Sequence, residues 1–371
     1  MEKTYDYIIV GSGLFGSVFA REMRRRGKRL LVLERREEIG GNIYTERVEG
    51  IDVHRYGPHI FHTNQREIWD YVDRLTPLCP VQFSPVANFH GEIYSLPFNM
   101  YTFHRLWGVR TPEEAASKLA AERAAYADIE PRNLEEQALK LVGRDIYEKL
   151  VKGYTEKQWG RPATALPAFI IRRLPVRLTY NYSYFDDRFQ GIPEDGYTKL
   201  AEALLYGVEV KTGVDFLADV AHWKAEAAKI VFTGRVDSYF GERLGTLEYR
   251  SLRFAEERLD TANYQGTAVM NYTAAEVPYT RITEHKHFVK AKSPVTVISR
   301  EFPQIWREGL EPYYPVNDEK NDRLYQQYRE AAKEEPEVIF GGRLGTYTYY
   351  NMDQVVEQAL AMVAQETGEA E

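Results

Sequence analysis

The first hydrophobic pattern along the chain predicts a β-α-β unit. Residues 5–10 (YDYIIV) are a short run of β-forming residues, and residues 14–26 repeat apolar positions at helical spacing. Residues 29–34 (RLLVLE) form a second apolar run with the length of a buried strand. Two buried strands joined by a helix build a parallel sheet, so we expect an α/β layer at this end of the chain.

The pattern becomes helical between residues 98 and 160. Thr111 precedes Pro112 and stands three residues before Glu114, which is a capping box at a helix start. A second helix start of the same kind follows at Asn133. These signals predict a small cluster of helices.

A third short helix is expected to end at Gly153, because glycine is the usual residue at a helix C-terminus. The stretch 151–160 (VKGYTEKQWG) would then leave the cluster as a loop. Tyr154 and Trp159 stand five residues apart in it, and a structural turn needs no indole. We therefore interpret this stretch as part of a binding site.

Alternating aromatic and β-branched residues predict an antiparallel sheet in the rest of the chain. A hairpin is expected over 81–97, and further strands over 177–185, 247–259, 266–273, 279–288 and 295–303. A last buried strand within 337–345 leads to a glycine pair. An amphipathic helix follows over 351–365, with Asn351 placed to cap it.

Composition and net charge make some classes of protein function less favoured than others. The 371 residues suffice for two or three packed units. Lys and Arg total 48 against 55 Asp and Glu, and the formal net charge of −7 disfavours nucleic acid or an anionic membrane surface as partner. No apolar run reaches the roughly 18 residues of a membrane span, so no membrane insertion is expected.

Cys79 is the only cysteine, which rules out an intrachain disulfide and a multi-cysteine metal site. The first residues show no pattern of a secretory signal. Together these features favour a cytoplasmic location. His59 and His62 stand three residues apart without a further ligand pattern nearby, so we predict no metal site.

The stretch GSGLFG carries a dinucleotide-binding pattern, G-x-G-x-x-G, with Gly11, Gly13 and Gly16 at its glycine positions. It follows a predicted strand and opens a helix, and Glu34 ends the next strand. The glycines permit a tight turn and close approach of a pyrophosphate to the helix N-terminus, and the carboxylate is placed for a ribose hydroxyl.

Two glycine pairs favour FAD over NAD as the cofactor. Gly40–Gly41 follows the second strand, and Gly341–Gly342 with Arg343 closes the last one. Such pairs at both ends of a chain resemble FAD-binding proteins of the glutathione-reductase and amine-oxidase kind, in which the C-terminal segment completes the flavin site.

Several long stretches carry a more specific resemblance. They are EGIDVHRYGPHIFHTN (49–64), KGYTEKQWG (152–160), RRLPVR (172–177), FQGIP (189–193), VPYTRITEHKHF (277–288), EPYYPVND (311–318) and GRLGTYTYYNMD (342–353). From about residue 4 to 365 the chain resembles the bacterial type of the UDP-galactopyranose mutase family.

The resemblance implies an isomerase that interconverts the pyranose and furanose forms of UDP-galactose. It implies that FAD acts in its reduced form, with flavin N5 attacking the anomeric carbon to give a transient flavin–sugar adduct and no net redox change. It further implies a UDP-sugar as the partner, a homodimer, and a place in galactofuranose and cell-surface polysaccharide synthesis.

The resemblance also assigns roles to residues. The implied catalytic residues are Arg173, Arg281 and His62. The implied substrate-binding residues are Tyr154, Trp159, Tyr184, Arg250, Asn271, Tyr314, Tyr349 and His59. The implied cofactor-binding residues are Gly11, Gly13, Phe15, Gly16, Glu34, Arg35, Gly41, Asn42, His62, Gly342, Arg343 and Met352.

The chemistry of the leaving group supports the arginines. A guanidinium keeps its charge and offers a planar fork to diphosphate oxygens. Tyr313 stands beside Tyr314, and the sequence leaves open which hydroxyl reaches the diphosphate. Leu150 and Val151 replace a phenylalanine pair of many relatives, so one side of the uracil site is expected to be aliphatic.

The resulting fold prediction is an α/β protein with a discontinuous Rossmann-like FAD-binding domain, an inserted helical cluster and an antiparallel β-sheet domain. The FAD-binding domain is expected to comprise 1–78, 190–240 and 335–371, the helical domain 98–165, and the sheet and substrate domain 79–97, 166–189 and 241–334.

Three alternatives remain open at the level of sequence. The first is a flavin oxidoreductase, and the second is a non-catalytic FAD-binding protein. The third keeps the mechanism but changes the sugar to UDP-N-acetylgalactosamine or a deoxyhexose nucleotide. The sequence does not give the groups at C2 and C6 of the sugar or the physiological reductant.

Overall fold

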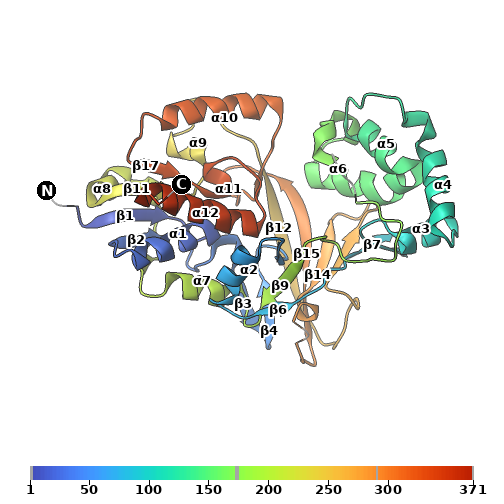
Figure 1. Cartoon of the computed structure of the whole chain (residues 1–371), viewed down its shortest axis with the longest axis horizontal. Helices are drawn as coiled ribbons and strands as arrows, with labels where there is room; N and C mark the ends of the chain where they lie inside the picture. The colour runs from blue at the N-terminus through green and yellow to red at the C-terminus, as the bar shows by residue number, and fades with distance from the viewer. Residues whose placement is uncertain (1–2, 172–174, 290, 370–371) are drawn as a thin grey trace.

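The computed structural model describes residues 3–171, 175–289 and 291–369, and Figure 1 shows three regions along its long axis. The first is built on a five-stranded sheet with the strand order β10-β2-β1-β11-β17, in which every pair is parallel. The strands are β1 (Tyr5–Val10), β2 (Leu30–Leu33), β10 (Glu209–Lys211), β11 (Ala227–Phe232) and β17 (Val338–Phe340).

Both faces of this sheet are covered, and its inner strands β2, β1 and β11 are accordingly mostly apolar. Ile9 and Val32 point into a core shared with helices α1, α7 and α12, while Ile8 and Leu31 point into a second core on the other face. The covering helices are α1 (Leu14–Arg25), α7 (Tyr197–Leu205), α8 (Val220–Glu226) and α12 (Met352–Thr367).

A seven-stranded sheet forms the middle region, with the order β16-β12-β15-β14-β13-β7-β8. Its neighbouring strands are antiparallel except β7 and β13, which run parallel, so the predicted antiparallel sheet is a mixed one. The strands are β7 (Val86–Phe89), β8 (Glu92–Ser95), β12 (Tyr249–Leu259), β13 (Val269–Tyr272), β14 (Arg281–Glu284), β15 (Thr296–Ile305) and β16 (Tyr314–Pro315).

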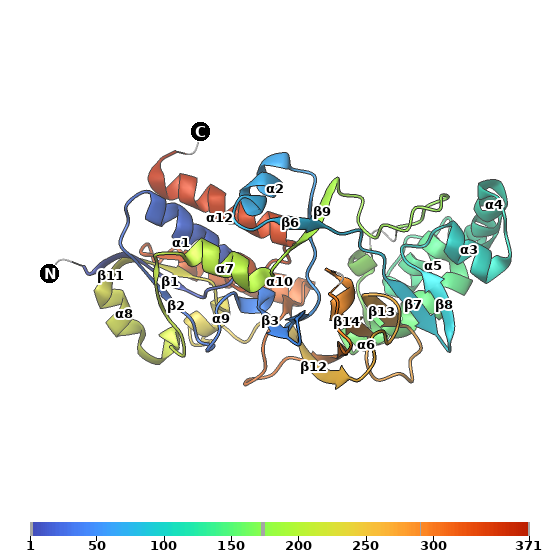
Figure 2. The same cartoon turned by 90° about the horizontal axis from the view of Figure 1, so that it is seen from below.

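The helical cluster lies at the far end from the parallel sheet, with the seven-stranded sheet between them (Figure 2). Its helices begin as expected, because the side chains of Thr111 and Asn133 accept the backbone N–H groups of Glu114 and Glu136. The members are α3 (Met100–Trp107), α4 (Pro112–Arg123), α5 (Leu134–Ile146), a π-helical turn (Tyr147–Lys152) and α6 (Gly153–Trp159).

The predicted helix end at Gly153 is wrong. Gly153 has helical backbone angles, with φ −63° and ψ −35°, and the chain continues as α6 to Trp159. Gly160, with a positive φ of 65°, ends the helix instead. Tyr154 and Trp159 therefore stand on a helix, which holds these rings more rigidly than a loop would.

The predicted strand over 177–185 is also wrong, because these residues form no strand. Tyr180 and Tyr182 alternate with polar residues, but both rings are largely exposed. Smaller elements complete the chain. They are β3 (Thr45–Val48), β4 (Ile51–His54), β5 (Phe61–Thr63), α2 (Arg66–Asp73), β6 (Leu78–Pro80), β9 (Phe189–Pro193), α9 (Val236–Tyr239), α10 (Glu319–Ala332) and α11 (Gly342–Gly345).

The parallel sheet with its covering helices and the inserted helical cluster agree with the predicted fold class. Within the three described stretches, no helix combines the length and the apolar character needed to cross a bilayer.

Candidate active site

A first cavity of about 380 Å³ lies where the carboxyl ends of β1, β2 and β11 meet the start of α1. This is the edge at which open α/β sheets bind nucleotides. It is lined by all the predicted cofactor positions except His62, namely Gly11, Gly13, Phe15, Gly16, Glu34, Arg35, Gly41, Asn42, Gly342, Arg343 and Met352.

The glycine loop explains why the cavity reaches the helix N-terminus. A side chain at Gly16 would bring its Cβ within 2.1 Å of the Gly11 carbonyl oxygen, so only glycine lets α1 start this close to β1. Gly13 caps the helix, and a Cβ there would meet nothing within 4 Å. The first N–H groups of α1 are thus open to an anionic ligand in the cavity.

Glu34 is buried at the end of β2 and already accepts hydrogen bonds within the chain. Its Oε2 accepts from the Ser12 backbone N–H at 2.9 Å and from the Ser12 hydroxyl at 2.6 Å. Arg36 stacks on the Tyr56 ring at 3.9 Å, and its Nη1 is buried without a partner among the described residues. Arg36 was not predicted, whereas its exposed neighbour Arg35 was.

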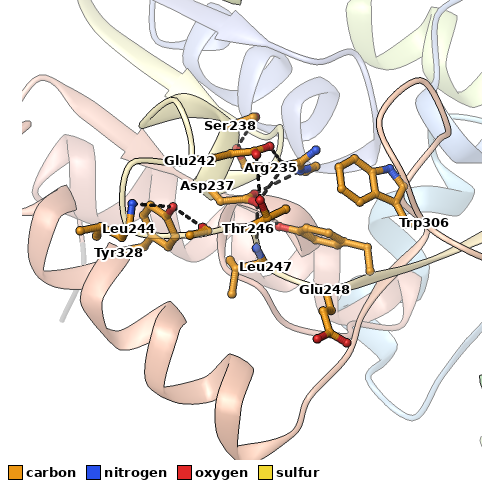
Figure 3. Close-up of polar contacts among 12 residues, drawn as sticks. Arg235, Asp237, Ser238, Glu242, Leu244, Thr246, Leu247, Glu248, Trp306 and Tyr328 are labelled. Carbon is orange, nitrogen blue, oxygen red and sulfur yellow. Dashed lines mark hydrogen bonds and ion pairs between the residues drawn. The ribbon is translucent and has the colours of Figure 1, made fainter.

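Arg235 forms part of the wall of this cavity, and neighbouring side chains fully compensate its positive charge (Figure 3). Asp237 is completely buried and accepts from Arg235 through two bonds, of 3.1 and 2.8 Å. Asp237 also accepts the Leu247 N–H and the Tyr249 hydroxyl, each at 3.0 Å. The Arg235 guanidinium stacks on Trp306 at 3.9 Å. We call these residues the Arg235 cluster.

A second cavity of about 530 Å³ lies between the helical cluster and the seven-stranded sheet. His59, Arg343 and Met352 line both cavities, so the two meet there. Most predicted substrate and catalytic positions line the second cavity, namely His59, His62, Tyr154, Trp159, Tyr184, Asn271, Arg281 and Tyr349.

Arg281, the first residue of β14, carries the main charge of this second cavity. Its Nη2 donates to the Tyr154 hydroxyl at 2.7 Å. Its Nε lies 3.3 Å from Glu301 Oε2, but the geometry makes no hydrogen bond there. Burial opposes the charge, yet Glu301 and the nearby tyrosine hydroxyls raise the pKa of Arg281 above its ordinary value.

Two further buried polar atoms beside Arg281 have no hydrogen-bond partner among the described residues. They are Asn271 Oδ1, opposite Arg281 in the β13–β14 pairing, and Gln158 Oε1 on α6. Buried polar atoms are nearly always paired in native proteins. Unpaired ones that line a cavity indicate a polar ligand.

Two predicted positions lie outside this cavity lining. The Tyr314 hydroxyl accepts from Gln158 Nε2, and its ring packs edge-on to Tyr349 at 6.2 Å. Arg250 lines a neighbouring cavity of about 330 Å³ that shares Trp159. Its Nε donates to the Gln158 carbonyl at 2.9 Å, so Arg250 also holds the C-terminal end of α6.

His62 is oriented by a residue that the motifs did not single out. Its Nδ1 lies 2.5 Å from Asp187 Oδ2, and its ring stacks on Phe185 at 3.7 Å. The pairing of β5 with β9 sets this contact, because His62 lies opposite Gln190, three residues after Asp187. The contact joins residues far apart in sequence, so no local pattern could reveal it.

Three buried or half-buried histidines form a chain of backbone contacts next to the junction of the cavities. His285 Nδ1 accepts the His54 N–H, and His54 Nδ1 accepts the His59 N–H, both at 3.2 Å. A nitrogen that accepts carries no proton, so the rings of His285 and His54 are neutral. Burial lowers the pKa of His285 to about 3 and that of His59 to about 4.

Arg173, predicted to grip the diphosphate, lies outside the described residues. Asp187, Glu301, Gln158 and Arg36 were missed. Gln158 stands inside the quoted stretch 151–160, and its helical spacing from Tyr154 would have placed both on one face had the helix been recognised.

Comparison with known proteins identifies the family. A family model described as UDP-galactopyranose mutase matches residues 149–349, and one for NAD(P)-binding Rossmann-like domains matches residues 9–75. A "Probable UDP-galactopyranose mutase" of Klebsiella pneumoniae is 38% identical over 96% of this chain and 93% of its own. A dTDP-fucopyranose mutase of Escherichia coli is 37% identical over 95% of this chain and 96% of its own.

Solved structures agree in fold. The chain superposes on a crystal structure of reduced UDP-galactopyranose mutase with a TM-score of 0.76, at 14% identity, covering 99% of this chain and 96% of the other. A putrescine oxidase structure gives a TM-score of 0.57 at 11% identity. The fold prediction is thereby confirmed, and the chain is an isomerase that belongs to the UDP-galactopyranose mutase family.

Proposed function

We propose that the protein interconverts the pyranose and furanose forms of a nucleoside diphosphate hexose, with UDP-galactose as the first candidate. The observation that carries this proposal is the junction of the two cavities. A dinucleotide-type cavity meets a cavity built around the Arg281 guanidinium at His59, Arg343 and Met352. A cofactor in the first could therefore face a sugar whose diphosphate lies in the second.

The first cavity fits FAD. The open N-terminus of α1 suits the pyrophosphate, and Glu34 and Arg36 offer polar groups at the end of β2. Gly342, Arg343 and Met352 would bring the C-terminal segment to the flavin end. When bound and reduced, FAD would supply N5 as the nucleophile for the anomeric carbon, and no net redox change is expected.

The second cavity fits a diphosphate with a base and a sugar. Arg281 brings the charge, and Tyr154, Tyr314 and Tyr349 bring hydroxyls that can donate to phosphate oxygens. These groups would stabilise the diphosphate as it leaves and hold it until the sugar recloses. His62, oriented by Asp187, would position a group at the junction rather than act as the nucleophile.

A second substrate is favoured by a specific observation. Leu150 and Val151 line the second cavity as buried aliphatic side chains on the same helical stretch as Tyr154. An aliphatic wall accepts the extra methyl group of thymine as readily as uracil. The dTDP-fucopyranose mutase at 37% identity makes a dTDP-deoxyhexose the second candidate. Homodimer formation and a cytoplasmic location remain predictions.

The proposal is tested with dithionite-reduced, FAD-loaded protein. It is incubated with UDP-galactopyranose, UDP-N-acetylgalactosamine and dTDP-fucopyranose, and furanose products are separated by chromatography. We expect furanose from at least one substrate, many turnovers per reduction, and none with oxidised protein. Consumption of NADPH in proportion to substrate would instead indicate an oxidoreductase. Binding without any product would indicate a non-catalytic FAD protein.

Reconstitution with 5-deaza-FAD tests the role of N5 separately. Carbon replaces nitrogen at that position, so the reduced analogue has no lone pair for the sugar. We expect ring contraction to cease while nucleotide sugar still binds. Full activity with the analogue would contradict a nucleophilic flavin, although it would leave the isomerase assignment intact.

A further inference from the structure

Helix α6 carries an internal lysine whose position has no role in the chemistry above. The Lys157 ammonium is enclosed by backbone carbonyl oxygens of a single loop, residues 272–279, which we call the carbonyl loop. Nζ lies within hydrogen-bond distance of the carbonyls of Tyr272 (2.7 Å), Ala274 (2.9 Å), Val277 (3.0 Å) and Tyr279 (3.0 Å), which share its three N–H donors. Four carbonyls around one ammonium is a cage of the kind that usually surrounds a bound cation.

A glycine one helical turn earlier docks on the same loop. A Cβ at Gly153 would come within 2.3 Å of the Thr273 carbonyl oxygen and 3.1 Å of the Ala275 nitrogen. Residues four apart lie on one face of a helix, so Gly153 and Lys157 together form the face that meets the carbonyl loop. This close approach is the reason for glycine at 153, in place of the helix cap that the sequence suggested.

The remaining faces of α6 hold the side chains that line the second cavity. Tyr154, Gln158 and Trp159 belong to that lining. The carbonyl loop joins β13 to β14, and it leads directly into Arg281. The contact of Lys157 with the loop therefore fixes the distance between Tyr154 on the helix and Arg281 on the sheet, whose side chains meet at 2.7 Å.

We propose that Lys157 is a positioning residue, whose ammonium clamps helix α6 to the carbonyl loop and so brings the aromatic and the arginine halves of the substrate cavity together. The inference rests on the proposed function for what the cavity binds, but the clamp itself can be tested without a ligand. Lys157 lies outside the lining of the second cavity, so its effect on substrate passes through α6 and Arg281.

The chain offers a matched control. The Lys286 ammonium also donates to three backbone carbonyls, of Ala262 (2.7 Å), Ser293 (2.7 Å) and Val295 (2.9 Å), and Lys286 lines none of the three cavities described above. Replacing either lysine by methionine keeps the chain length and removes the charge. A difference between the two variants therefore reports the position of Lys157 rather than the general cost of losing such an ammonium.

Two measurements on the FAD-loaded protein decide the question. The first is hydrogen exchange of the peptide that covers 153–159, without ligand. The second is the dissociation constant of UDP by calorimetry. In Lys157→Met we expect exchange of this peptide to speed up at least tenfold and the UDP dissociation constant to rise at least tenfold, at unchanged FAD content. In Lys286→Met we expect both within twofold of wild type.

Chemical rescue completes the test. Lys157→Cys is made in a Cys79→Ser background, so that the introduced thiol is the only one. Alkylation with 2-bromoethylamine rebuilds an ammonium at the length of lysine, with the thiol sulfur displacing bromide. We expect UDP affinity to return to within threefold of the Cys79→Ser protein. Alkylation with iodoethane adds a neutral group and should restore nothing.

The outcomes separate the two proposals. Wild-type protein that binds none of UDP, dTDP or their sugars counts against the proposed function, while the exchange data still judge the clamp. Unchanged exchange in Lys157→Met overturns the clamp. Faster exchange with unchanged UDP affinity overturns the positioning role, and so does an equal loss of affinity in Lys286→Met.

Discussion

Two half-buried arginines in this protein show opposite ways of carrying a charge. The charge of Arg235 is fully compensated inside the chain, by two bonds to Asp237, one to Glu242 and a stacked Trp306 (Figure 3). Among the described residues, Arg281 has one hydrogen bond, to Tyr154, and Glu301 lies 3.3 Å from its Nε without accepting a hydrogen bond from it. A compensated charge holds the fold together. A charge that is left partly uncompensated beside a cavity is available to a ligand.

The surroundings of the two arginines strengthen the comparison. Two bonds of Asp237, from the Leu247 N–H and the Tyr249 hydroxyl, join α9 to the start of β12, so the Arg235 cluster fixes elements of the scaffold. Around Arg281, Asn271 Oδ1 and Gln158 Oε1 also have no partner in the part of the chain that the structure describes. Burial alone therefore does not distinguish a functional arginine in this family. What distinguishes it is whether hydrogen-bond and ion-pair partners within the chain satisfy its guanidinium.

The largest expected effect comes from breaking the compensated pair. Asp237→Ala leaves Arg235 with Glu242 as its only ion-pair partner among the described residues, and it leaves the Leu247 N–H and the Tyr249 hydroxyl without their acceptor. We therefore expect the free energy of unfolding to fall by about 3–5 kcal/mol. Urea denaturation of the FAD-loaded protein measures it. UDP affinity of the protein that remains folded should stay within threefold of wild type.

Glu248→Ala is the control in the same region. Glu248 pairs with Lys320 and Arg161 near the surface, where removing a partner costs at most about 1 kcal/mol. An equal loss of stability in both variants would show that compensation inside the Arg235 cluster is not what stabilises it.

The reverse pattern is expected for Arg281→Ala. A charged hydrogen bond contributes about 1.5–3 kcal/mol, so turnover should fall roughly 10- to 150-fold while FAD content changes little. Arg281→Lys should recover part of the activity, because an ammonium cannot fork between two oxygens. Steady-state kinetics with reduced enzyme measures both.

Arg300 serves as the control for Arg281. It lies on the adjacent strand β15 and pairs with Glu257 at 2.7 Å. Arg300→Ala should leave turnover unchanged. Wild-type kinetics in Arg281→Ala would remove Arg281 from the site and with it the contrast between the two arginines.

The sequence predicted the first cavity well and the contacts of the second poorly, for a physical reason. The glycine loop and Glu34 act through backbone geometry over a few residues, so spacing reveals them. Asp187 and Lys157 act on partners more than a hundred residues away. Only the topology of β5, β9, β13 and β14 brings these groups together.

The two misjudged segments have the same origin. Gly153 was interpreted as a helix end, but glycine also allows close approach of two backbones, and here the Thr273 carbonyl requires it. The aromatic alternation over 177–185 was interpreted as a strand, but Tyr180 and Tyr182 are exposed and no neighbouring strand pairs with them. A local sequence pattern shows which conformations a segment can adopt. Tertiary contacts decide which of these conformations it adopts.

The histidines beside the cavity junction extend the comparison to groups that are kept neutral. His285 has a pKa of about 3 in the folded chain, below the ordinary value of about 6.5 expected when unfolded. Between these values the unfolded chain binds a proton that the folded chain does not, so stability falls as pH falls. For this one group the loss between pH 7 and pH 5 is about 2 kcal/mol.

Denaturation of wild type and His285→Asn at both pH values isolates this contribution. Asparagine can still accept the His54 N–H but does not titrate. We expect the variant to lose about 2 kcal/mol less than wild type on acidification, and to retain FAD better at pH 5. Equal acid sensitivity of the two proteins would assign the effect to other groups.

The smallest expected effect concerns which group donates and which accepts in a single hydrogen bond. Asp187 accepts from His62 Nδ1, which leaves Nε2 free to accept from a group at the cavity junction. Asn64 Nδ2 donates to Asp187 Oδ1 at 2.5 Å, so in Asp187→Asn the amide oxygen keeps that contact and the amide N–H₂ faces His62. His62 Nδ1 must then accept, and the ring proton moves to Nε2. The shape of the site is preserved while its hydrogen-bond direction is reversed. We expect kcat to fall about fivefold with little change in stability, in line with the roughly 1 kcal/mol of one hydrogen bond. Asp186→Asn is the control, because Asp186 is exposed, pairs with Arg177 at 2.5 Å and adjoins Asp187 in the chain.

Nitrogen NMR of labelled histidine follows the tautomer of His62 directly. A shifted tautomer with wild-type kcat would mean that His62 contributes its ring to packing against Phe185 and nothing to the reaction.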